Sequence, residues 1–471
     1  MKRAPLLTRR EILRTGATLA AATLAAPLLR AQTNPAKREF NIRDFGAVGD
    51  GATLDTAAIQ RALDEAGGAG GGARVVVPGG KKFLIGSLTL KGGIELHLAD
   101  DAELVVSTDP QHFAGRAALN ALEATGLRLT GTGRINGRSR EFMEHFDDKD
   151  EWWRPKPFRP RLAVLTGCKD LEVRDLTFFE APSWTLHLVG CQRVLIDRLK
   201  IRNQLDVPNC DGIDPDHCRD MEIKNCDIVC GDDAIVVKTS RQGASYGGSS
   251  NISVRDCVLE TQDSGVKIGT ETVADISGIR FERCEIKTCC RGCTIQLRDA
   301  GNVSNVEFRD INFVARYFSA PWWGRGEAIS FTAIPRNPET KVGVLSDVRV
   351  TNVTGRAENS VRISGSPQSR VRDVSFDNVA ITLDRWTKYP GGVWDNRPTS
   401  AMPDLEPHTT PAFSVRHADK VALKNCRVAW GKNVPDDFTH ALEVEDATDV
   451  DHSSFVGEAA HPKRDKAIAI R

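Results

Sequence analysis

Short stretches of alternating apolar and polar residues recur along most of the chain, between residues 84 and 430. Each stretch alternates apolar and polar positions and ends in Asn, Asp or Cys before a further apolar pair. The first apolar positions of six successive stretches, at steps of 23, 27, 31, 27 and 27 residues, are Leu171, Val194, Met221, Ile252, Ile279 and Val306. This repeat, with Asn, Asp and Gly at its corners, is typical of a parallel β-helix with turns stacked ~4.8 Å apart. We predict an all-β fold, a single-stranded right-handed parallel β-helix; a β-sandwich would not keep one repeated turn for so long.

A short helix is predicted ahead of the repeat, over residues 56–66. Ile59, Leu63 and Ala66 would share one of its faces, and Asp55 stands where a side chain caps a helix N-terminus. An open stack of strands needs its terminal edge covered. We therefore expect this helix to cap the N-terminal end of the stack.

Three long insertions interrupt the repeat, and each contains tryptophan. The insertions are residues 141–160, 316–341 and 384–411. Insertions in a solenoid collect on one face and commonly shape its binding groove. Trp322, Trp323 and Arg325 suit stacking on sugar rings and binding of acidic groups, which makes them candidate substrate-binding residues. Ordinary loop packing is the alternative for each tryptophan.

The first 31 residues read as a targeting segment. Two arginines at residues 9–10 precede an apolar run over residues 16–29. This pattern is typical of a twin-arginine export signal, with cleavage expected near Ala31. The run is Ala-rich and too short to span a bilayer comfortably, which disfavours a membrane anchor. We expect one catalytic β-helix domain over residues 32–471, in a periplasmic or secreted monomer with no membrane attachment after cleavage.

The charge balance argues against a nucleic-acid partner. The 471 residues include 63 basic and 63 acidic ones. Removal of the predicted signal takes away six basic residues and one acidic residue, which leaves 57 and 62 and a net charge of −5. A mildly acidic protein is a poor nucleic-acid candidate. Any anionic substrate must therefore meet a local basic patch.

The 12 cysteines do not form the pattern of a disulfide framework. Seven of them occupy matching places beside the strand patterns, as expected for small buried side chains stacked in rows: Cys168, Cys191, Cys218, Cys226, Cys257, Cys284 and Cys426. Cys289, Cys290 and Cys293 could form a bridge in an oxidising compartment, but their spacing does not assign one. No Cys or His spacing typical of zinc occurs, and neither a metal nor another cofactor is expected.

Two groups of aspartates are the strongest candidates for chemistry. Asp211, Asp214 and Asp216 form the first group, and Asp232 and Asp233, 21 residues after Asp211, form the second. Because 21 residues is close to one turn, the groups should lie about one layer apart. Inverting hydrolysis of a glycosidic bond needs a protonated and an ionised carboxyl ~6.5–9.5 Å apart. Crowding should raise at least one carboxyl pKa, as an acid catalyst requires. We expect Asp214 and Asp216 to be corner or supporting residues.

The sequence NCDGID at residues 209–214 and the GDD that ends at Asp233 resemble the N-T-D-G-x-D and G-D-D motifs of glycoside hydrolase family 28. These are the polygalacturonases and their pectin-degrading relatives. The likeness covers most of residues 40–450, including DFGAVGDG and APSWTLHLVGC. It implies inverting cleavage of α-glycosidic bonds in pectic, galacturonate-containing polysaccharide or oligosaccharide. By position, Asp232 matches the proton donor, and Asp211 and Asp233 match the carboxylates that activate water.

Two departures from the family pattern bear on the substrate. Ser264 replaces the histidine of a G-H-G segment, and residues 292–296 replace an R-I-K triplet whose basic pair holds a galacturonate carboxylate beyond the scissile bond. A neutral sugar there would not need those charges, so rhamnogalacturonan-type hydrolysis is an alternative. Lys267, Arg291 and Arg298 are candidates for a rearranged basic contact, with exposed charge on the turns as the alternative.

The remaining polar residues near the motifs have simpler interpretations. Glu271 is a candidate for the border of the groove, whereas Lys238, His187 and His217 are expected to be structural. Two other classes of function stay open. A polysaccharide lyase would release an unsaturated uronate and lose activity with a chelator. A non-catalytic carbohydrate-binding β-helix would bind glycan without product, and the density of carboxylates counts against it.

Overall fold

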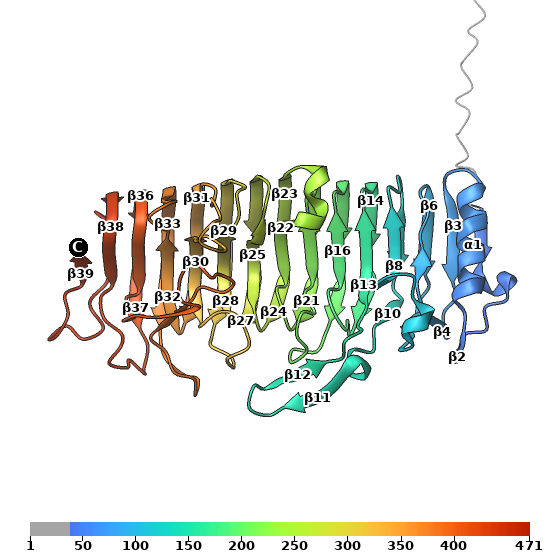
Figure 1. Ribbon diagram of the computed structural model, residues 1–471, viewed down its shortest axis with the longest axis horizontal. Helices are drawn as coiled ribbons and strands as arrows, with labels where there is room; N and C mark the ends of the chain where they lie inside the picture. The colour runs from blue at the N-terminus through green and yellow to red at the C-terminus, as the bar shows by residue number, and fades with distance from the viewer. Residues whose placement is uncertain (1–37) are drawn as a thin grey trace, which may run out of the picture. The chain divides into compact units, whose positions relative to one another are not determined.

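The computed structural model describes residues 38–471, which form one unit, and the predicted signal at residues 1–31 lies outside the described residues. Parallel pairing joins 35 strands into one continuous sheet that winds into a helix of stacked turns (Figure 1). The predicted right-handed parallel β-helix is confirmed. A β-sandwich is excluded because each strand pairs in parallel with the equivalent strand of the next turn.

The strands stack in three ladders. The first, called the site ladder below, contains β5 (Leu88–Thr89), β8 (Ala117–Leu122), β13 (Arg161–Thr166), β16 (Leu186–Val189), β19 (Ile213–Asp216), β22 (Ile235–Thr239), β25 (Ser264–Thr272), β28 (Arg291–Leu297), β30 (Glu327–Ala333), β32 (Asn359–Ser364), β36 (Phe413–Lys424), β38 (Leu442–Asp451) and β39 (Ile468–Ile470). The second contains β1 (Glu39–Asn41), β3 (Ala73–Val77), β6 (Ile94–Leu98), β9 (Arg128–Gly131), β14 (Lys169–Arg174), β17 (Gln192–Asp197), β20 (Arg219–Lys224), β23 (Ser249–Arg255), β26 (Ile276–Glu282), β29 (Val303–Ala315), β31 (Ser346–Ala357) and β33 (Val371–Leu383).

The third ladder completes each turn. It contains β2 (Asp50–Leu54), β4 (Lys82–Ile85), β7 (Glu103–Val106), β10 (Arg134–Asn136), β15 (Thr177–Phe179), β18 (Lys200–Arg202), β21 (Asp227–Cys230), β24 (Val258–Thr261), β27 (Glu285–Cys289) and β37 (Arg427–Trp430). The long strands β29, β31 and β33 continue from the second ladder into the third. The six apolar positions that define the sequence repeat are direct neighbours in the second ladder, so the predicted register is confirmed.

Alternate residues of each strand point inward, where they form columns along the axis. Phe281 and Phe308 are neighbours in one such column, with ring centroids 5.2 Å apart, and Phe331 of the site ladder stacks on Phe308 across the core at 5.4 Å. All 12 cysteines are buried and unpaired in the described chain, so Cys289, Cys290 and Cys293 form no bridge here. The predicted cysteine rows are present because neighbouring turns place one small thiol above the next.

The corners between the second and third ladders use left-handed backbone. One column of such corners, at the same steps as the sequence repeat, consists of Asp175, Arg198, Asn225, Asp256, Arg283 and Asp310. Asn225 has φ 55° and donates from Nδ2 to Asp197 Oδ1 at 2.8 Å. Asn and Asp tolerate this conformation better than other residues with a Cβ.

Asn225→Val is therefore expected to lower the free energy of unfolding by ~1–2 kcal/mol, because a β-branched side chain is strained at positive φ. Asn225→Gly also removes the side-chain hydrogen bond, but glycine adopts positive φ without strain. This variant should therefore lose less stability than Asn225→Val. Urea-induced unfolding of the two variants measures the difference. Equal stability of Val and Asn at this position would contradict the strain argument.

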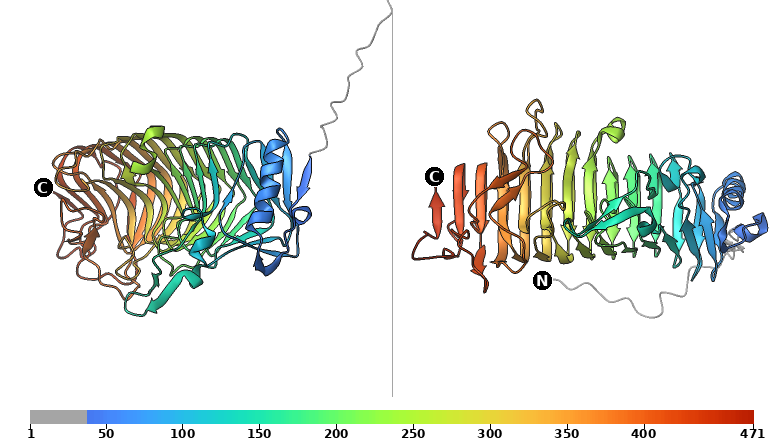
Figure 2. Two further views of the ribbon diagram at one scale, coloured as in Figure 1. Left: turned by 45° about the vertical axis from the view of Figure 1, so that its right-hand side comes forward. Right: turned by 60° about the horizontal axis from the view of Figure 1, so that its bottom comes forward.

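The N-terminal end of the stack is covered as predicted. Helix α1 (Thr56–Gly68) lies across it, with Ile59, Leu63 and Ala66 buried against the first turns (Figure 2). The predicted cap is wrong in its detail. Asp55 makes no side-chain cap bond, because its carboxylate instead accepts the backbone N–H groups of Val48 (2.6 Å) and Gly49 (3.0 Å).

Two of the predicted insertions leave the stack beside the site ladder, whereas the predicted bounds of the second, 316–341, are wrong because residues 327–333 form β30 of that ladder. The first contains the antiparallel hairpin of β11 (Met143–Asp147) and β12 (Trp152–Pro155), and the third contains the pair β34 (Val393–Asp395) and β35 (Leu405–Pro407). The short 3₁₀ helices are η1 (Ile42–Phe45), η2 (Pro110–His112), η3 (Ser139–Phe142) and η4 (Arg241–Tyr246). No helix within residues 38–471 has the length and apolar character that a membrane crossing requires.

Candidate functional site

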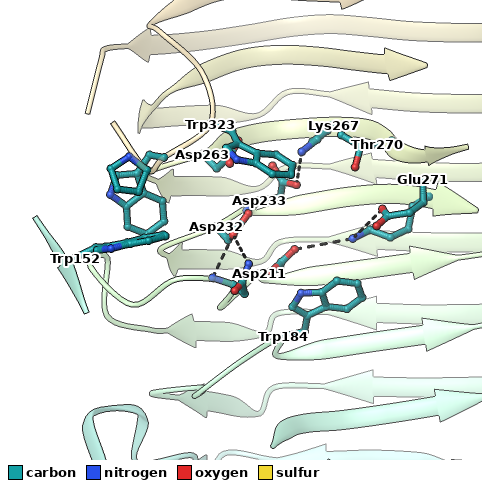
Figure 3. Close-up of a pocket in the computed structure, with 15 residues that line it drawn as sticks. Trp152, Trp184, Asp211, Asp232, Asp233, Asp263, Lys267, Thr270, Glu271 and Trp323 are labelled. Carbon is teal, nitrogen blue, oxygen red and sulfur yellow. Dashed lines mark hydrogen bonds and ion pairs between the residues drawn. The ribbon is translucent and has the colours of Figure 1, made fainter. Parts of the chain in front are cut away.

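A cavity of about 270 Å³ opens on the site ladder, at the turns of β19, β22 and β25 (Figure 3). Its lining combines four tryptophans, five acids, two lysines and several smaller or polar residues: Trp152, Trp184, Trp322, Trp323, Asp211, Asp232, Asp233, Asp263, Glu271, Lys238, Lys267, Asn209, Gly269, Thr270 and Pro321. The three predicted catalytic aspartates therefore share one cavity. Of the predicted substrate-binding residues, Lys267, Glu271, Trp322 and Trp323 are present.

Asp211 and Asp233 occupy the same corner of adjacent turns. Ile213 pairs with Ile235, and each aspartate stands two residues before its isoleucine. The Gly212 N–H donates to the Asp233 carbonyl oxygen at 2.9 Å, which fixes the two corners one above the other. One carboxyl oxygen from each of Asp211, Asp232 and Asp233 lies within 4.8 Å of the others. The oxygens come this close because Asp232 and Asp233 are consecutive in the chain and Asp211 lies one turn spacing away.

Asp232 is the most accessible of the three aspartates and is half-buried. Its Oδ2 accepts the backbone and side-chain N–H groups of Asn209 at 3.2 and 3.4 Å, and its Oδ1 accepts the Asp233 N–H at 2.9 Å. Burial, followed by the charge of Asp233, raises the pKa of Asp232 to about 6. This carboxyl can therefore hold a proton in mildly acidic solution.

Asp233 is held by a buried ammonium group. Lys267 Nζ lies 2.7 Å from its Oδ2, and both side chains are less than 6% exposed. The Ser264 N–H donates to the other oxygen at 3.2 Å. Burial alone would lower the pKa of Lys267, but the charges of Asp233 and Asp263 raise it. Lys267 therefore keeps its proton, and its ammonium group faces the Asp233 carboxyl directly.

Asp211 faces a second buried lysine. Lys238 Nζ lies 2.8 Å from Asp214 Oδ1 and 4.0 Å from both Asp211 Oδ2 and Glu271 Oε2. Burial, followed by the charges of Asp232 and Asp214, raises the pKa of Asp211. Lys238 keeps its proton because these acids outweigh its own burial and raise its pKa. It thus lines the cavity, although the sequence interpretation gave it only a structural role.

Sequence reasoning missed a fourth aspartate, Asp263, which lines the cavity. Ile235 and Val266 are ladder partners, and Asp232 and Asp263 each stand three residues before one of them. The two aspartates are therefore equivalent on successive turns, a relation that extending the repeat alignment to the corners would have revealed. Burial, followed by the charge of Asp233, raises the pKa of Asp263.

Trp184 forms the wall beside Asp211 and was also missed. The Lys238 ammonium and the Arg161 guanidinium lie 4.0 and 4.1 Å from its ring centroid. On the other side, Trp323 approaches Lys267 and Asp233 (Figure 3). Aromatic faces on both sides of the carboxylates suit the apolar faces of sugar rings. The sequence signal for Trp184 is its place in the APSWTLHLVGC segment, directly before β16.

Three predicted binding arginines do not line the cavity, which corrects the prediction. Arg291, Arg298 and Arg325 are buried, and their guanidinium groups donate to backbone oxygens of Asp395 (3.0 Å), Asn396 (3.2 Å) and Trp322 (3.1 Å), respectively. The physical reason is that the 384–411 insertion folds over this part of the site ladder. The alternative of exposed charge on the turns is therefore wrong as well.

The other polar residues singled out in the sequence have structural roles. Asp216 accepts hydrogen bonds from the Ser240 backbone and hydroxyl and contacts His187 Nε2 at 3.2 Å. The ring of His217 is held between carbonyl oxygens, including that of Ser240 at 2.8 Å. These groups are fully buried, as expected for structural residues. Ser264 is also buried, and its hydroxyl donates to Asp263 Oδ1 at 3.0 Å.

Asp211, Asp232 and Asp233 are the group among the described residues whose oxygens could jointly hold a cation. Two ammonium groups offset part of the negative charge of this cluster, since Lys267 bonds Asp233 and Lys238 lies 4.0 Å from Asp211. Proton transfer between carboxyl groups and water is thus the chemistry that the arrangement supports directly.

Comparison with known proteins places these features in context. The model of Glycosyl hydrolases family 28 matches residues 68–389, which include all four cavity aspartates. A probable polygalacturonase of Vitis vinifera is 29% identical over 432 residues, covering 82% of this chain and 86% of that protein. Two solved structures share the fold. The exopolygalacturonase of Thermotoga maritima (22% identity, TM-score 0.65) covers 83% of this chain and 92% of its own. The family 28 exopolygalacturonase of Yersinia enterocolitica (18% identity, TM-score 0.67) covers 88% and 78%.

Proposed function

Because the chain belongs to glycosyl hydrolase family 28, we propose that this polygalacturonase-like enzyme cleaves α-glycosidic bonds in pectic, galacturonate-containing polysaccharide or oligosaccharide. The observation that carries the proposal is the meeting of Asp211, Asp232 and Asp233, from adjacent turns, in one cavity walled by tryptophans. The twin-arginine pattern supports export as part of this proposal. A fusion of residues 1–31 to a reporter, followed by cell fractionation, tests it.

Asp232 is assigned the role of proton donor to the leaving oxygen. Its raised pKa, about 6, keeps the proton available, and its half-exposed position gives a substrate access. Asp233, which is paired with the Lys267 ammonium, takes the proton of the attacking water, and Asp211 holds that water from the adjacent turn. Separate proton donor and acceptor groups are what a single-step displacement requires.

We assign an inverting course. The Lys267 ammonium on Asp233 withdraws charge from the carboxylate, which disfavours its direct attack on carbon but leaves it able to accept a proton. A retaining reaction is the alternative suggested by the short oxygen contacts, since its two carboxyls lie ~5–5.5 Å apart. Proton NMR of the first-formed product decides between them, because inversion of an α-linkage releases the β-anomer. Initial release of the α-anomer would contradict the assignment.

The pH dependence follows from the donor. Asp232 must be protonated, so kcat/KM should fall about tenfold per pH unit once the pH rises well above about 6. The decline should be absent from the binding of a non-hydrolysed oligosaccharide. Initial rates in overlapping buffers at constant ionic strength measure this limb. A rate that stays constant to pH 8 would contradict the assignment of Asp232.

The decisive test of substrate and reaction is incubation of the purified protein with homogalacturonan, rhamnogalacturonan and their oligomers, with and without EDTA. We expect saturated products with new reducing ends, in the same yield with chelator. An unsaturated uronate that disappears with EDTA would select a lyase, and glycan binding without product would select a non-catalytic module. The buried Thr294 and Gln296 in place of a basic pair favour rhamnogalacturonan as the second candidate substrate.

A further inference from the structure

A second cavity lies on the same face of the helix, on the N-terminal side of the carboxylates. It has a volume of about 660 Å³ and is lined by residues of β8 and β13, by residues 155–157 at the end of β12, and by Arg116, Arg159, Ser183 and Gln242. Strand β13 is two turns before β19 in the site ladder, and β8 is three turns before it. At ~4.8 Å per turn, this cavity lies ~10–14 Å along the axis from the catalytic turn.

The second cavity is basic. Arg116, Lys156, Arg159 and Arg161 line it, and no acidic residue does. Within residues 38–471, none of these four side chains forms an ion pair with a carboxylate. Four such cations together are notable because the chain without its first 31 residues carries a net charge of −5. Their donors bond neutral groups, such as the Glu141 carbonyl for Lys156 and the Pro208 carbonyl for Arg159. An anionic ligand would therefore add charge interactions without competing with an internal carboxylate.

The two cavities share a wall. Arg159 Nη2 donates to Asn209 Oδ1 at 2.6 Å, and Asn209 in turn contacts Asp232. Arg161 stacks on Trp184, whose neighbour Ser183 lines the basic cavity. A ligand chain can thus pass from the carboxylates over Trp184 to the arginines.

In the opposite direction, Pro321, Trp322 and Trp323 border the catalytic cavity, and the 384–411 insertion contacts Arg291 and Arg298 of the following turn. The basic cavity on the N-terminal side is therefore where we place the continuation of the bound chain.

We propose that the basic cavity is a subsite for the carboxylates of uronic acid units on the N-terminal side of the scissile bond. Guanidinium groups match carboxylates in geometry, and the partly exposed Trp184 lies between the subsite and the catalytic aspartates. Residues 292–296 carry no basic side chain that could bind a substrate carboxylate. In this proposal, the arginines and the lysine of the basic cavity bind such carboxylates at the other end of the cleft. This subsite rests on the proposed function, since it extends the same bound chain.

Arg116→Gln with Lys156→Gln tests the subsite, because both side chains are exposed and their loss should leave the fold intact. KM for oligogalacturonates long enough to span both cavities should rise about 10-fold at unchanged kcat, which corresponds to loss of ~1.4 kcal/mol of binding. Methyl-esterified oligomers should show no such change. The matched control is Lys169→Gln with Lys200→Gln, two exposed lysines on the other ladders. An unchanged KM, or an equal rise with the methyl ester, would overturn the proposal.

Direct binding separates this proposal from the proposed function. Calorimetry with trigalacturonate on Asp232→Asn protein, with and without the two Gln substitutions, needs no turnover. Weaker binding on substitution supports the subsite even if the wild-type protein hydrolyses no pectic substrate, a result that would reject the hydrolase assignment alone. A single-stranded oligonucleotide serves as a second anionic ligand. If the two Gln substitutions leave trigalacturonate binding unaltered, or weaken only the binding of the oligonucleotide, the subsite is overturned.

Discussion

Asp232→Asn is expected to lower the release of reducing ends by ~10²–10⁴-fold, the usual contribution of a positioned general acid. The substitution removes the proton but preserves the shape of the side chain. Its Oδ1 can still accept the Asp233 N–H, so the turn should keep its conformation. Reducing-sugar assays at pH 5, together with circular dichroism and the thermal midpoint, separate lost chemistry from lost structure.

Asp449→Asn is the matched control for this change. Asp449 is exposed on β38, far along the stack from the cavity, and its positive φ of 54° is as acceptable to Asn as to Asp. It should retain full activity and stability. An Asp232→Asn protein that is as active as this control would reject the assignment of the proton donor.

Lys267→Met is expected to destabilise the protein by ~3–5 kcal/mol, because it leaves the buried Asp233 carboxylate without its ion partner. Activity should fall as well, since the ion pair that holds the Asp233 carboxyl in place is lost. Urea-induced unfolding, followed by tryptophan fluorescence and far-UV circular dichroism, measures the stability. Initial rates measured under conditions where the variant remains folded give the catalytic effect.

The double variant Lys267→Met with Asp233→Asn tests whether the unpaired charge of Asp233 causes the loss of stability. Removing the charge of Asp233 should restore much of the lost stability, because no buried ion is then left unpaired. Activity should not return, since the proton acceptor is absent. If the double variant were as unstable as Lys267→Met alone, the loss would come from packing of the lysine chain rather than from the uncompensated charge.

The sequence was sufficient for the fold because the β-helix repeats one local rule. The positions Leu171 to Val306 that define the repeat are direct ladder partners, so register followed from counting residues. The same counting placed Asp211 one turn from Asp233. It also implied the position of Asp263, which went unrecognised because the motif comparison ended at the second acidic pair.

Insertions were less predictable for a physical reason. Residues 384–411 follow no repeat, and their course over the site ladder depends on contacts distant in sequence, such as Arg291 with the Asp395 carbonyl. A basic residue on a turn therefore reads as exposed when its covering loop is unknown. Lys238 and Lys267 share this difficulty, since only the assembled cavity shows how closely each approaches an aspartate.

The corner that joins Asp211 to Asp233 has a consequence for how such an enzyme can diversify. The spacing of the two acids is an inherent dimension of the sheet, held by the bond from the Gly212 N–H to the Asp233 carbonyl rather than by any mobile segment. No closing motion is needed to assemble them. Replacement of the surrounding loops can therefore redirect the enzyme to new glycans while the reactive centre is inherited unchanged.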